Sequence, residues 1–202
     1  MKREIKTKQT HDKILSQAII EFSSKGYEAG SLNTISQQGS LSKGIIYHYF
    51  NSKKELYLAC IRRCFTDITE DLKARLSKQE GLSLQDYFSA RSSFFLSHPE
   101  EADLFCQAVL YPPDDLISDI KKEREDFDHF NGEVLRRILS GHEIRSDLSE
   151  ADVFQVFRQF QDFLNAKYHQ SPEKDSAEAM KSHEQECITA MSILLYGIFR
   201  RE

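Results

Sequence analysis

The sequence predicts an all-α protein. Its 202 residues include only eight Gly and four Pro, which leaves few turn formers for the many short strands of a β-sandwich or barrel. Apolar residues recur instead at the spacing that places them on one face of a helix. With 40% hydrophobic and 29% charged residues, the chain has the composition of a folded protein with an ordinary charged surface. We therefore expect about nine helices.

The first helix is expected over about residues 8–25. Its apolar residues at helical spacing are Ile14, Leu15, Ala18, Ile19 and Phe22. Gly26 follows where a left-handed C-terminal stop is expected, because glycine adopts positive φ without steric cost.

Serine residues mark the expected starts of the next three helices. Ser31 and Ser42 can each cap a short helix, the second over residues 43–50, since a serine hydroxyl accepts a hydrogen bond from a free backbone N–H. Ser52 and Glu55 fit a capping box, in which each side chain satisfies a free N–H at a helix start. A long helix is expected from there to about residue 78.

Five further helices are expected beyond Gly81. Breakers separate them, including His98-Pro99 and Ser171-Pro172. The expected ranges are 84–97, 101–110, 115–139, 149–169 and 176–200.

Residues 31–50 follow the plan of a helix-turn-helix, whose second helix enters the major groove of DNA. In that second helix Lys43 can reach a phosphate or a guanine edge. Gly44 removes a side chain near the helix start and lets the backbone approach the duplex, and Ile45 can meet a thymine methyl group.

The aromatic residues of this helix allow two interpretations. Tyr47 and His48 can donate hydrogen bonds to phosphate oxygens. Alternatively, Tyr47, Tyr49 and Phe50 are core residues of a small helical bundle. The spacing alone does not decide between the two.

The charge distribution is asymmetric along the chain. Residues 1–63 contain 11 Lys/Arg against 5 Asp/Glu, a net charge of +6, and residues 64–202 contain 16 against 27, a net charge of −11. A basic small unit followed by an acidic larger one is typical of a nucleic-acid-binding domain joined to a regulatory or assembly domain. The alternative is an uneven scatter of solvated charge.

A specific set of residues spans His11 to Arg62. Its members are Ile14, Ala18, Phe22, Gly26-Tyr27, Ser31-Leu32, Ile35, the run from Leu41 to Phe50, and the run from Ser52 to Leu56. With these residues the stretch resembles the DNA-binding domain of TetR-family transcriptional regulators. The resemblance covers about a quarter of the chain, and residues 64–202 match only in length and helicity.

The resemblance implies a DNA-binding domain over residues 1–56 and a helical ligand-binding and dimerisation domain over 57–202. The protein would then be a repressor that binds a palindromic double-stranded operator as a homodimer and is released by a small-molecule inducer. By the family's pattern, Tyr47, His48 and Lys53 hold phosphates. Asn33, Lys43, Gly44 and Ile45 would face base edges, and Ser31 and Thr34 would add backbone contacts.

The turn departs from the family's pattern. Where the family usually has alanine followed by glycine, this chain has Gly39-Ser40. Either the turn shifts by one residue so that Gly39 takes the positive φ, or Ser40 adopts it at a modest cost.

The resemblance also implies a pocket for a small, often apolar or aromatic, ligand among the middle helices. Core packing explains most of the aromatic residues in this region. The candidate lining residues are Phe65, Phe88, Phe95, Phe105, Tyr111, Phe127 and Phe130.

The two C-terminal helices are expected to form the dimer interface. Their apolar faces carry Phe154, Phe157, Phe160 and Phe163 on one helix and Ile188, Met191, Leu195 and Ile198 on the next. Stacking each pair on its symmetry mate would give a four-helix interface. The alternative is that these faces pack only within their own subunit.

Two other classes of protein compete with this interpretation. A helical enzyme is disfavoured because His183-Glu184-Gln185-Glu186-Cys187 replaces the second histidine of the His-Glu-x-x-His zinc helix with cysteine. The sequence also contains no G-x-S-x-G elbow, P-loop or Rossmann fingerprint. A helical adaptor that binds only protein would not need the basic N-terminal unit. We therefore expect no enzymatic activity, no cofactor and no metal.

Neither a membrane-spanning segment nor a secretory signal is evident. The longest nearly apolar run, Met191 to Phe199, is far shorter than the roughly 20 residues that cross a bilayer. The charged N-terminus leads into no apolar region. The expected location is the cytoplasm, without a membrane partner.

Overall fold

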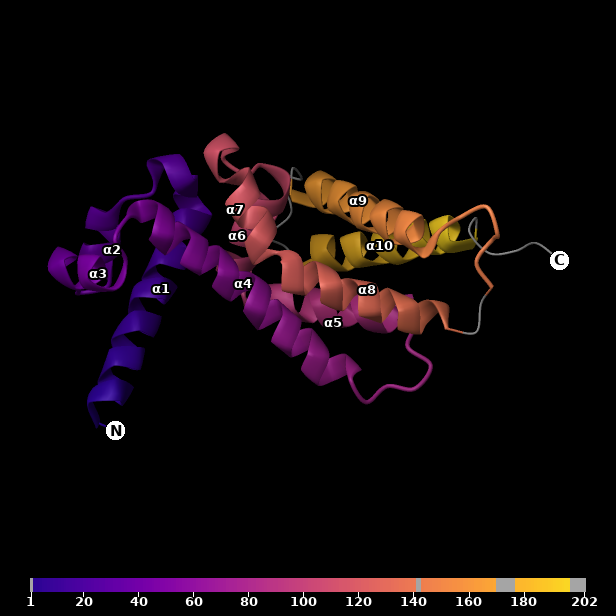
Figure 1. Ribbon diagram of the computed structural model, residues 1–202, viewed down its shortest axis with the longest axis horizontal. Coiled ribbons are helices and arrows are strands. Elements are labelled where there is room, and N and C mark those ends of the chain that lie inside the picture. The colour runs from indigo at the N-terminus through magenta and orange to yellow at the C-terminus, as the bar shows by residue number, and fades with distance from the viewer. Residues whose placement is uncertain (1, 141–142, 170–176, 197–202) are drawn as a thin grey trace. The chain divides into compact units, whose positions relative to one another are not determined.

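The computed structural model describes residues 2–140, 143–169 and 177–196, and its regular elements there are all helical (Figure 1). It contains ten α-helices within these ranges, together with a short 3-10 helix, η1. None of the helices described combines the length and the apolar composition that crossing a membrane requires.

The chain divides by packing into two compact units. The first comprises Met1–Thr66 and Pro99–Arg124, and the second comprises Asp67–His98 and Glu125–Glu202. The expected boundary after residue 56 was placed by the DNA-binding motif, and it remains a prediction about function. Packing instead joins three later helical segments to the N-terminal ones.

The first unit contains α1 (Lys2–Ala29), α2 (Leu32–Gln38), α3 (Lys43–Tyr49), the first half of α4 (Lys53–Leu76), α6 (Pro99–Leu110), η1 (Asp114–Leu116) and α7 (Ile117–Glu123). The helix α1 begins earlier than expected, because residues 2–7 lack apolar periodicity but are mostly good helix formers. It is interrupted at Gly26, whose φ of 72° confirms the predicted positive-φ position. Ile14, Phe22, Ile35 and Ile46 are buried in the core.

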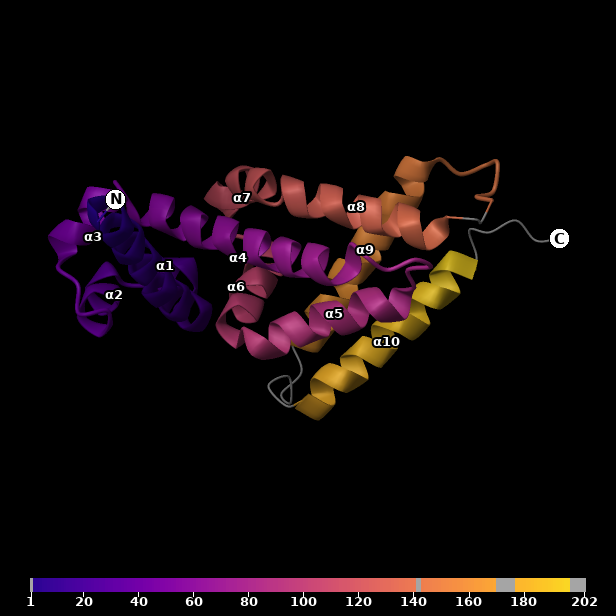
Figure 2. The same ribbon diagram turned by 90° about the horizontal axis from the view of Figure 1, so that it is seen from below.

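The second unit contains the rest of α4, α5 (Leu84–Ser97), α8 (Glu125–Leu139), α9 (Glu150–His169) and α10 (Ala177–Tyr196). The helix α10 packs against α5 and α9 (Figure 2). Ser83 with Asp86 caps the start of α5, and Ser149 with Asp152 does the same for α9. The last four residues of the expected range 176–200 lie outside the described residues.

The single helix expected over 115–139 was wrong. The structure divides this range into η1, α7 and α8, with a break at Arg124. Lys121 and Lys122 occupy the last turn of α7, and acidic residues occupy the first turn of α8. This arrangement matches the macrodipoles of two separate helices, since cations stabilise a helix C-terminus and anions an N-terminus.

Candidate DNA-binding site

The helix α2 is capped by two side chains at its N-terminus. The Ser31 hydroxyl accepts a long hydrogen bond of 3.5 Å from the Thr34 N–H, which confirms the predicted cap. The Ser31 N–H donates to Glu21 Oε1 at 3.0 Å. Glu21 lies on α1 and is 5% exposed, so a buried carboxylate ties α1 to the start of α2. No local sequence pattern indicates this role of Glu21.

The turn between α2 and α3 is closed by Ser36, a residue whose role no local sequence pattern indicates. Its hydroxyl donates to the Leu41 carbonyl at 2.6 Å, and its own carbonyl accepts from the Leu41 N–H at 2.9 Å. Ser36 is buried. These two hydrogen bonds hold the ends of the turn together and so fix the direction in which α3 leaves it.

Ser40 is the residue with positive φ in this turn. Its φ is 47°, whereas Gly39 has an ordinary right-handed φ of −75°. Of the two alternatives left by the sequence, the structure therefore has the one in which Ser40 carries the strain. Gly39 is needed for a different reason. A Cβ there would lie 2.9 Å from both the Ile35 carbonyl oxygen and Leu41 Cδ1.

The helix α3 has one buried face and one exposed face. The Ser42 hydroxyl caps it by accepting from the Ile45 N–H at 3.2 Å, as predicted. Ile46 and Phe50 are buried and anchor the helix. The exposed side chains of α3 at the positions expected to contact DNA belong to Lys43, Tyr47 and His48, and Gly44 is also exposed.

The two interpretations of the aromatic residues are now resolved residue by residue. Phe50 is a core residue. Tyr49 is half-buried, and its hydroxyl donates to the Thr7 carbonyl on α1 at 3.2 Å. Tyr47 is 54% exposed and is therefore not part of the core. Like Lys43 and His48, it is an exposed side chain of α3.

The remaining predicted DNA-contact residues differ in accessibility. Asn33 is exposed, and Ser31, Thr34 and Ile45 are half-buried. Lys53 is also half-buried. Its amine donates to the Glu28 carbonyl at 2.9 Å and lies 5.0 Å from the centre of the Tyr27 ring. Lys53 is thus held near the C-terminal end of α1.

The start of α4 is capped as predicted in one half of the box and differently in the other. The Ser52 hydroxyl accepts from the Glu55 N–H at 3.1 Å. The Glu55 carboxylate accepts from the backbone N–H of Asn51 at 2.8 Å and from the Asn51 side-chain amide at 2.9 Å. The acidic side chain therefore reaches one residue further back than a standard capping box predicts.

Two ion pairs join α4 to α7. Lys54 Nζ lies 2.7 Å from Asp119 Oδ2, and this hydrogen bond lowers the pKa of Asp119 and raises that of Lys54. Arg62 binds both carboxylate oxygens of Glu123, at 2.6 and 2.7 Å. In the same unit, α6 packs on α1, and the Gln107 amide donates to the Ser23 carbonyl. The helix α6 therefore contacts α1, and α7 contacts α4.

The seven candidate ligand-contact residues fall in both units. Phe65, Phe105 and Tyr111 belong to the first unit, where the rings of Phe65 and Phe105 pack edge to face at 5.3 Å. The second unit holds Phe88, Phe95, Phe127 and Phe130. Phe95 is half-buried, Tyr111 is 54% exposed, and the other five are buried. Their role as ligand contacts stays a prediction.

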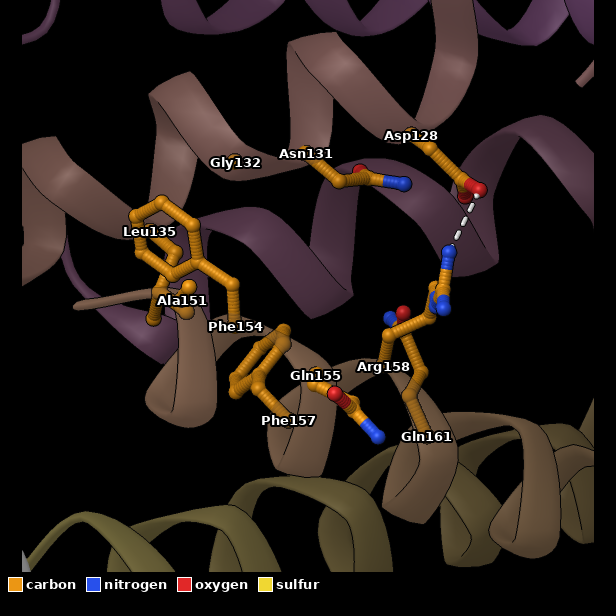
Figure 3. A pocket seen from close by; sticks show the side chains of 10 residues that line it. All are labelled: Asp128, Asn131, Gly132, Leu135, Ala151, Phe154, Gln155, Phe157, Arg158 and Gln161. Atoms are coloured by element: carbon orange, nitrogen blue, oxygen red, sulfur yellow. Dashed lines mark hydrogen bonds and ion pairs between the residues drawn. The ribbon is translucent and has the colours of Figure 1, made fainter. Parts of the chain in front are cut away.

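A cavity of about 300 Å³ lies elsewhere, between α8 and α9 of the second unit (Figure 3). None of the seven candidates lines it. Its walls include Asn131 and Gly132 on α8 and Phe154, Arg158 and Gln161 on α9. These residues were not predicted from the sequence, because nothing in the local pattern separates a pocket wall from a core face.

The two C-terminal helices bury part of the apolar surface that was expected at a dimer interface. Phe157, Met191 and Leu195 are buried within their own subunit, whereas Phe163 is 61% exposed. Ile193 is 69% exposed, and Val156 is also exposed. Phe157, Met191 and Leu195 are therefore wrongly placed in the expected interface, and Ile198 lies outside the described residues.

In the His-Glu-Gln-Glu-Cys segment of the second unit, Cys187 is buried and His183 is half-buried. The His183 ring lies 3.5 Å from Cys187 Sγ and stacks on Tyr168 at 4.4 Å. Burial lowers the pKa of His183 to about 4 and raises that of Cys187 to about 12, so the ring is neutral and the thiol protonated at neutral pH. The described residues contain no group of three or more potential metal ligands. His183 and Cys187 are therefore packing residues of α10.

These features define the class: a helix-turn-helix protein with a second helical unit. Residues 14–60 match the family described as bacterial regulatory proteins of the tetR family. Residues 81–195, more than half of the chain, match the tetracyclin repressor-like C-terminal domain. The chain belongs to the tetR family of bacterial regulatory proteins.

Curated relatives match over the N-terminal region. The chain is 39% identical over 54 residues to the biofilm operon icaADBC HTH-type negative transcriptional regulator IcaR of Staphylococcus aureus (strain Newman). It is 37% identical over 54 residues to IcaR of Staphylococcus epidermidis. Each match covers 27% of this chain and 29% of the relative. The chain thus spans less than a third of the length of these relatives.

Solved structures match over most of the chain. The transcriptional regulator FadR from Bacillus subtilis, in complex with stearoyl-CoA, gives a TM-score of 0.70 at 15% identity, covering 88% of this chain and 97% of that one. A tetR family regulator from Shewanella sp. PV-4 gives 0.68 at 16% identity, covering 95% and 99%. At these identities the likeness is one of fold.

Proposed function

We propose that this protein is a ligand-responsive transcriptional repressor that binds a palindromic operator as a homodimer and is released by a small molecule. The observation that carries the proposal is the exposed face of α3, where Lys43, Tyr47 and His48 stand beside Gly44. A short capped helix with cationic and hydroxyl groups on its free face is suited to the major groove. The IcaR relatives are described as negative transcriptional regulators, which supports repression.

The residue roles follow from accessibility and chemistry. Tyr47, His48 and Lys53 hold phosphates, with Ser31 and Thr34 as additional backbone contacts. Asn33, Lys43, Gly44 and Ile45 face base edges. The net charge of +6 over residues 1–63 supports this assignment, because a basic unit attracts the phosphate backbone.

Residues 1–56 form the DNA-binding domain and 57–202 the ligand-binding and dimerisation domain in this proposal. The exposed apolar residues of α9 and α10 face a second copy of the chain. Two copies related by a two-fold axis would place their α3 helices in successive major grooves, about 34–36 Å apart. A repressor of this kind acts on chromosomal DNA and therefore in the bacterial cytoplasm.

Signal transmission between the two domains is supported by chain connectivity. The helix α7 is joined to α4 through Asp119 and Glu123, and α8 begins directly after it at Glu125. A ligand that displaces α8 pulls on α7 and thereby on the helix that follows the DNA-binding motif. Ligand releases DNA only if it binds the released conformation more tightly than the DNA-bound one.

DNA fragments selected by the purified full chain, followed by a mobility-shift assay, test the proposal. We expect binding to a roughly palindromic sequence, with affinity that falls steeply as salt rises, because phosphate contacts release counterions. Absence of binding to any genomic fragment, or binding that does not depend on salt, would contradict it.

Two variants divide the roles of the exposed face. Tyr47→Phe should weaken binding to all sequences alike, since its hydroxyl would hold a phosphate. Lys43→Ala should weaken binding and also relax base preference. The matched control is Lys121→Ala, which removes the same charge from an exposed position on α7. Identical sequence preferences for Lys43→Ala and wild type would remove Lys43 from the base-contacting set.

A further inference from the structure

The cavity between α8 and α9 combines an apolar end with a polar end. Figure 3 shows the rings of Phe154 and Phe157 at one end and the side chains of Asp128, Asn131 and Arg158 at the other. Leu135 and Ala151 complete the apolar part of the wall. Small-molecule sites have this composition, in which apolar contacts provide affinity and a few placed polar groups fix orientation.

The polar end is held in place by a chain of hydrogen bonds. The buried Tyr87 hydroxyl donates to Asn131 Oδ1 at 2.8 Å and accepts from the Gln161 amide at 3.1 Å. Gln161 is itself buried. Because the Asn131 oxygen is engaged by Tyr87, the amide nitrogen is the end that projects toward the cavity (Figure 3). A preorganised hydrogen-bond donor thus faces the cavity.

The charges that line the cavity cancel. The one cation, Arg158, pairs with the one anion, Asp128, at 3.1 Å. A ligand carboxylate would have to compete with Asp128 for the guanidinium, and a ligand cation would have to compete with Arg158 for the carboxylate. Both side chains are partly exposed, Arg158 at 48% and Asp128 at 23%, and their pairing leaves the lining without a net charge that would attract an ionic ligand. The lining therefore favours an uncharged ligand.

Gly132 indicates that the cavity is kept open. Glycine in a helix interior is destabilising relative to alanine. At Gly132 no packing constraint requires it, because an added Cβ would meet only the Phe154 ring, at ordinary contact distances of 3.7 and 3.8 Å. A larger side chain at this position would project toward Phe154 and fill the cavity. The glycine is explained if a ligand occupies that space.

The cavity also faces away from the exposed apolar side of α9. At 100° per residue, Val156 lies about 160° and Phe163 about 180° around the helix from Phe154. A ligand between α8 and α9 is therefore compatible with a second copy of the chain on the opposite side of α9. Its volume of about 300 Å³ is at the small end of ligand sites, which suits one or two rings rather than a long acyl chain.

We propose that the cavity lined by Asn131, Gly132, Phe154, Arg158 and Gln161 binds the effector, a small uncharged aromatic molecule with a hydroxyl or carbonyl group. The rings stack on Phe154 and Phe157, and the polar group accepts from the Asn131 amide. This inference rests on the proposed function, because it gives the regulator its ligand class and the place where that ligand binds.

Binding of defined probes to the full chain without DNA tests the inference. The uncharged probes are 2-naphthol and benzamide, and the charged counterparts of similar shape are 2-naphthoate and benzoate, with palmitate as a long-chain probe. Isothermal titration measures each affinity. We expect an uncharged probe to bind at least tenfold more tightly than its carboxylate counterpart and than palmitate.

Two pairs of variants locate the binding. Gly132→Leu and Ala151→Phe should each weaken the uncharged probe at least tenfold by filling the cavity from opposite walls. Their matched controls, Gly132→Ala and Ala151→Ser, should change the affinity less than threefold. Ala151 is exposed, so Ala151→Phe tests the site even if Gly132→Leu fails to fold, which circular dichroism reveals.

Binding that is equal in the filled and control variants would overturn the inference, as would tighter binding of the carboxylates or no binding of either uncharged probe. DNA binding by the wild-type chain is measured separately. A chain that binds DNA but shows no cavity-dependent ligand binding retains the proposed function and loses this inference. A chain that shows cavity-dependent ligand binding but no DNA binding retains the ligand site and loses the proposed function.

Discussion

The helices α3 and α9 both expose large side chains, but of opposite chemical character. The exposed face of α3 carries Lys43, Tyr47 and His48, whereas α9 exposes Val156 and Phe163. The first set suits phosphates and base edges, and the second suits an apolar protein surface. In the proposed function, these two surfaces of one helical chain serve two different partners, DNA and a second copy of the chain.

The two regions also differ in how they are stabilised. The helices α2 and α3 are seven residues each, too short to be stable alone, and depend on Glu21, Ser36 and Ser42 for hydrogen bonds at their ends. Capping interactions contribute about 1 kcal/mol each. The helices α9 and α10 are 20 residues each and depend on buried apolar side chains. Substitutions should therefore affect the two regions by different mechanisms.

The largest expected effect is on the apolar surface. Phe163→Glu or Ile193→Glu should place an unpaired charge in the proposed dimer interface and cost several kcal/mol of association, about 3–5 in a fully buried setting. Light scattering should show a monomer, and a mobility-shift assay should show that this monomer has lost operator binding. The control Leu96→Glu introduces the same charge at an exposed leucine of α5 and should remain dimeric. If the Phe163 and Ile193 variants remain dimeric, the interface lies elsewhere.

Leu195→Glu provides the contrast within α10. Leu195 is 4% exposed and packs inside its own subunit. Its replacement should lower the stability of the subunit itself, so a loss of dimer by this variant would not locate the interface. If Leu195→Glu unfolds cooperatively at the same midpoint temperature as the wild type, this side chain is not buried as described.

A second expected effect concerns the interior that α9 and α10 share. The pKa of His183 is lowered from 6.5 to about 4, chiefly by burial. The unfolded chain therefore binds this proton more readily than the folded one, and stability is complete above pH 6.5 and declines as pH falls toward 4. The loss between pH 7 and pH 5 should be about 2 kcal/mol.

Chemical unfolding at the two pH values measures this loss, and His183→Gln provides the control. The variant cannot take up the proton and should lose much less stability over the same interval. Carboxylates such as Asp86 and Asp152, whose pKa is lowered by hydrogen bonds, should contribute mainly below this interval. An equal loss in the variant would assign the pH dependence to other groups.

The sequence predicted features that are local and missed those that need the third dimension. Ser31 and Ser42 lie next to the helices they cap, and Gly26 directly follows its helix, so a short window contains the whole signal. Glu21 is ten residues from the Ser31 N–H that it binds, and its role depends on a bend of the chain at Gly26. No pattern in a short window contains that contact.

The second unit also shows the difference between features with a local sequence signal and features that depend on distant residues. The break at Arg124 had a local signal, since Lys121 and Lys122 precede it and acidic residues follow, but the continuous apolar stripe outweighed this signal. Apolar periodicity also gave Leu195 and Phe163 the same status, although only one of them is exposed. Which apolar residues a helix buries depends on its neighbours, and periodicity does not specify these.

A smaller effect is expected from substitutions in the turn between α2 and α3, which orients the polar surface of α3. Gly39→Ala should destabilise the first unit by roughly 1–2 kcal/mol, because the new Cβ meets the Ile35 carbonyl oxygen and Leu41 at 2.9 Å, and the buried turn must shift. Thermal unfolding measures the change. DNA affinity should fall as well, since the turn orients α3. A variant as stable as wild type would show that the turn has room that the structure does not indicate.

The smallest effect is expected at Ser40, and its sign is opposite. With φ at 47°, Ser40 occupies the left-handed region, which costs a non-glycine residue about 1–2 kcal/mol. Ser40→Gly removes that strain but gives the unfolded chain more freedom, which offsets about 0.4–1 kcal/mol of the gain. The net expectation is a stabilisation of about 0.5 kcal/mol, visible as slower hydrogen exchange of the Ser40 and Leu41 amides, which donate to Gln37 and Ser36. The control Ser40→Ala retains the strain and should exchange no more slowly than wild type. Faster exchange in Ser40→Gly than in Ser40→Ala would mean that the serine is unstrained in this turn.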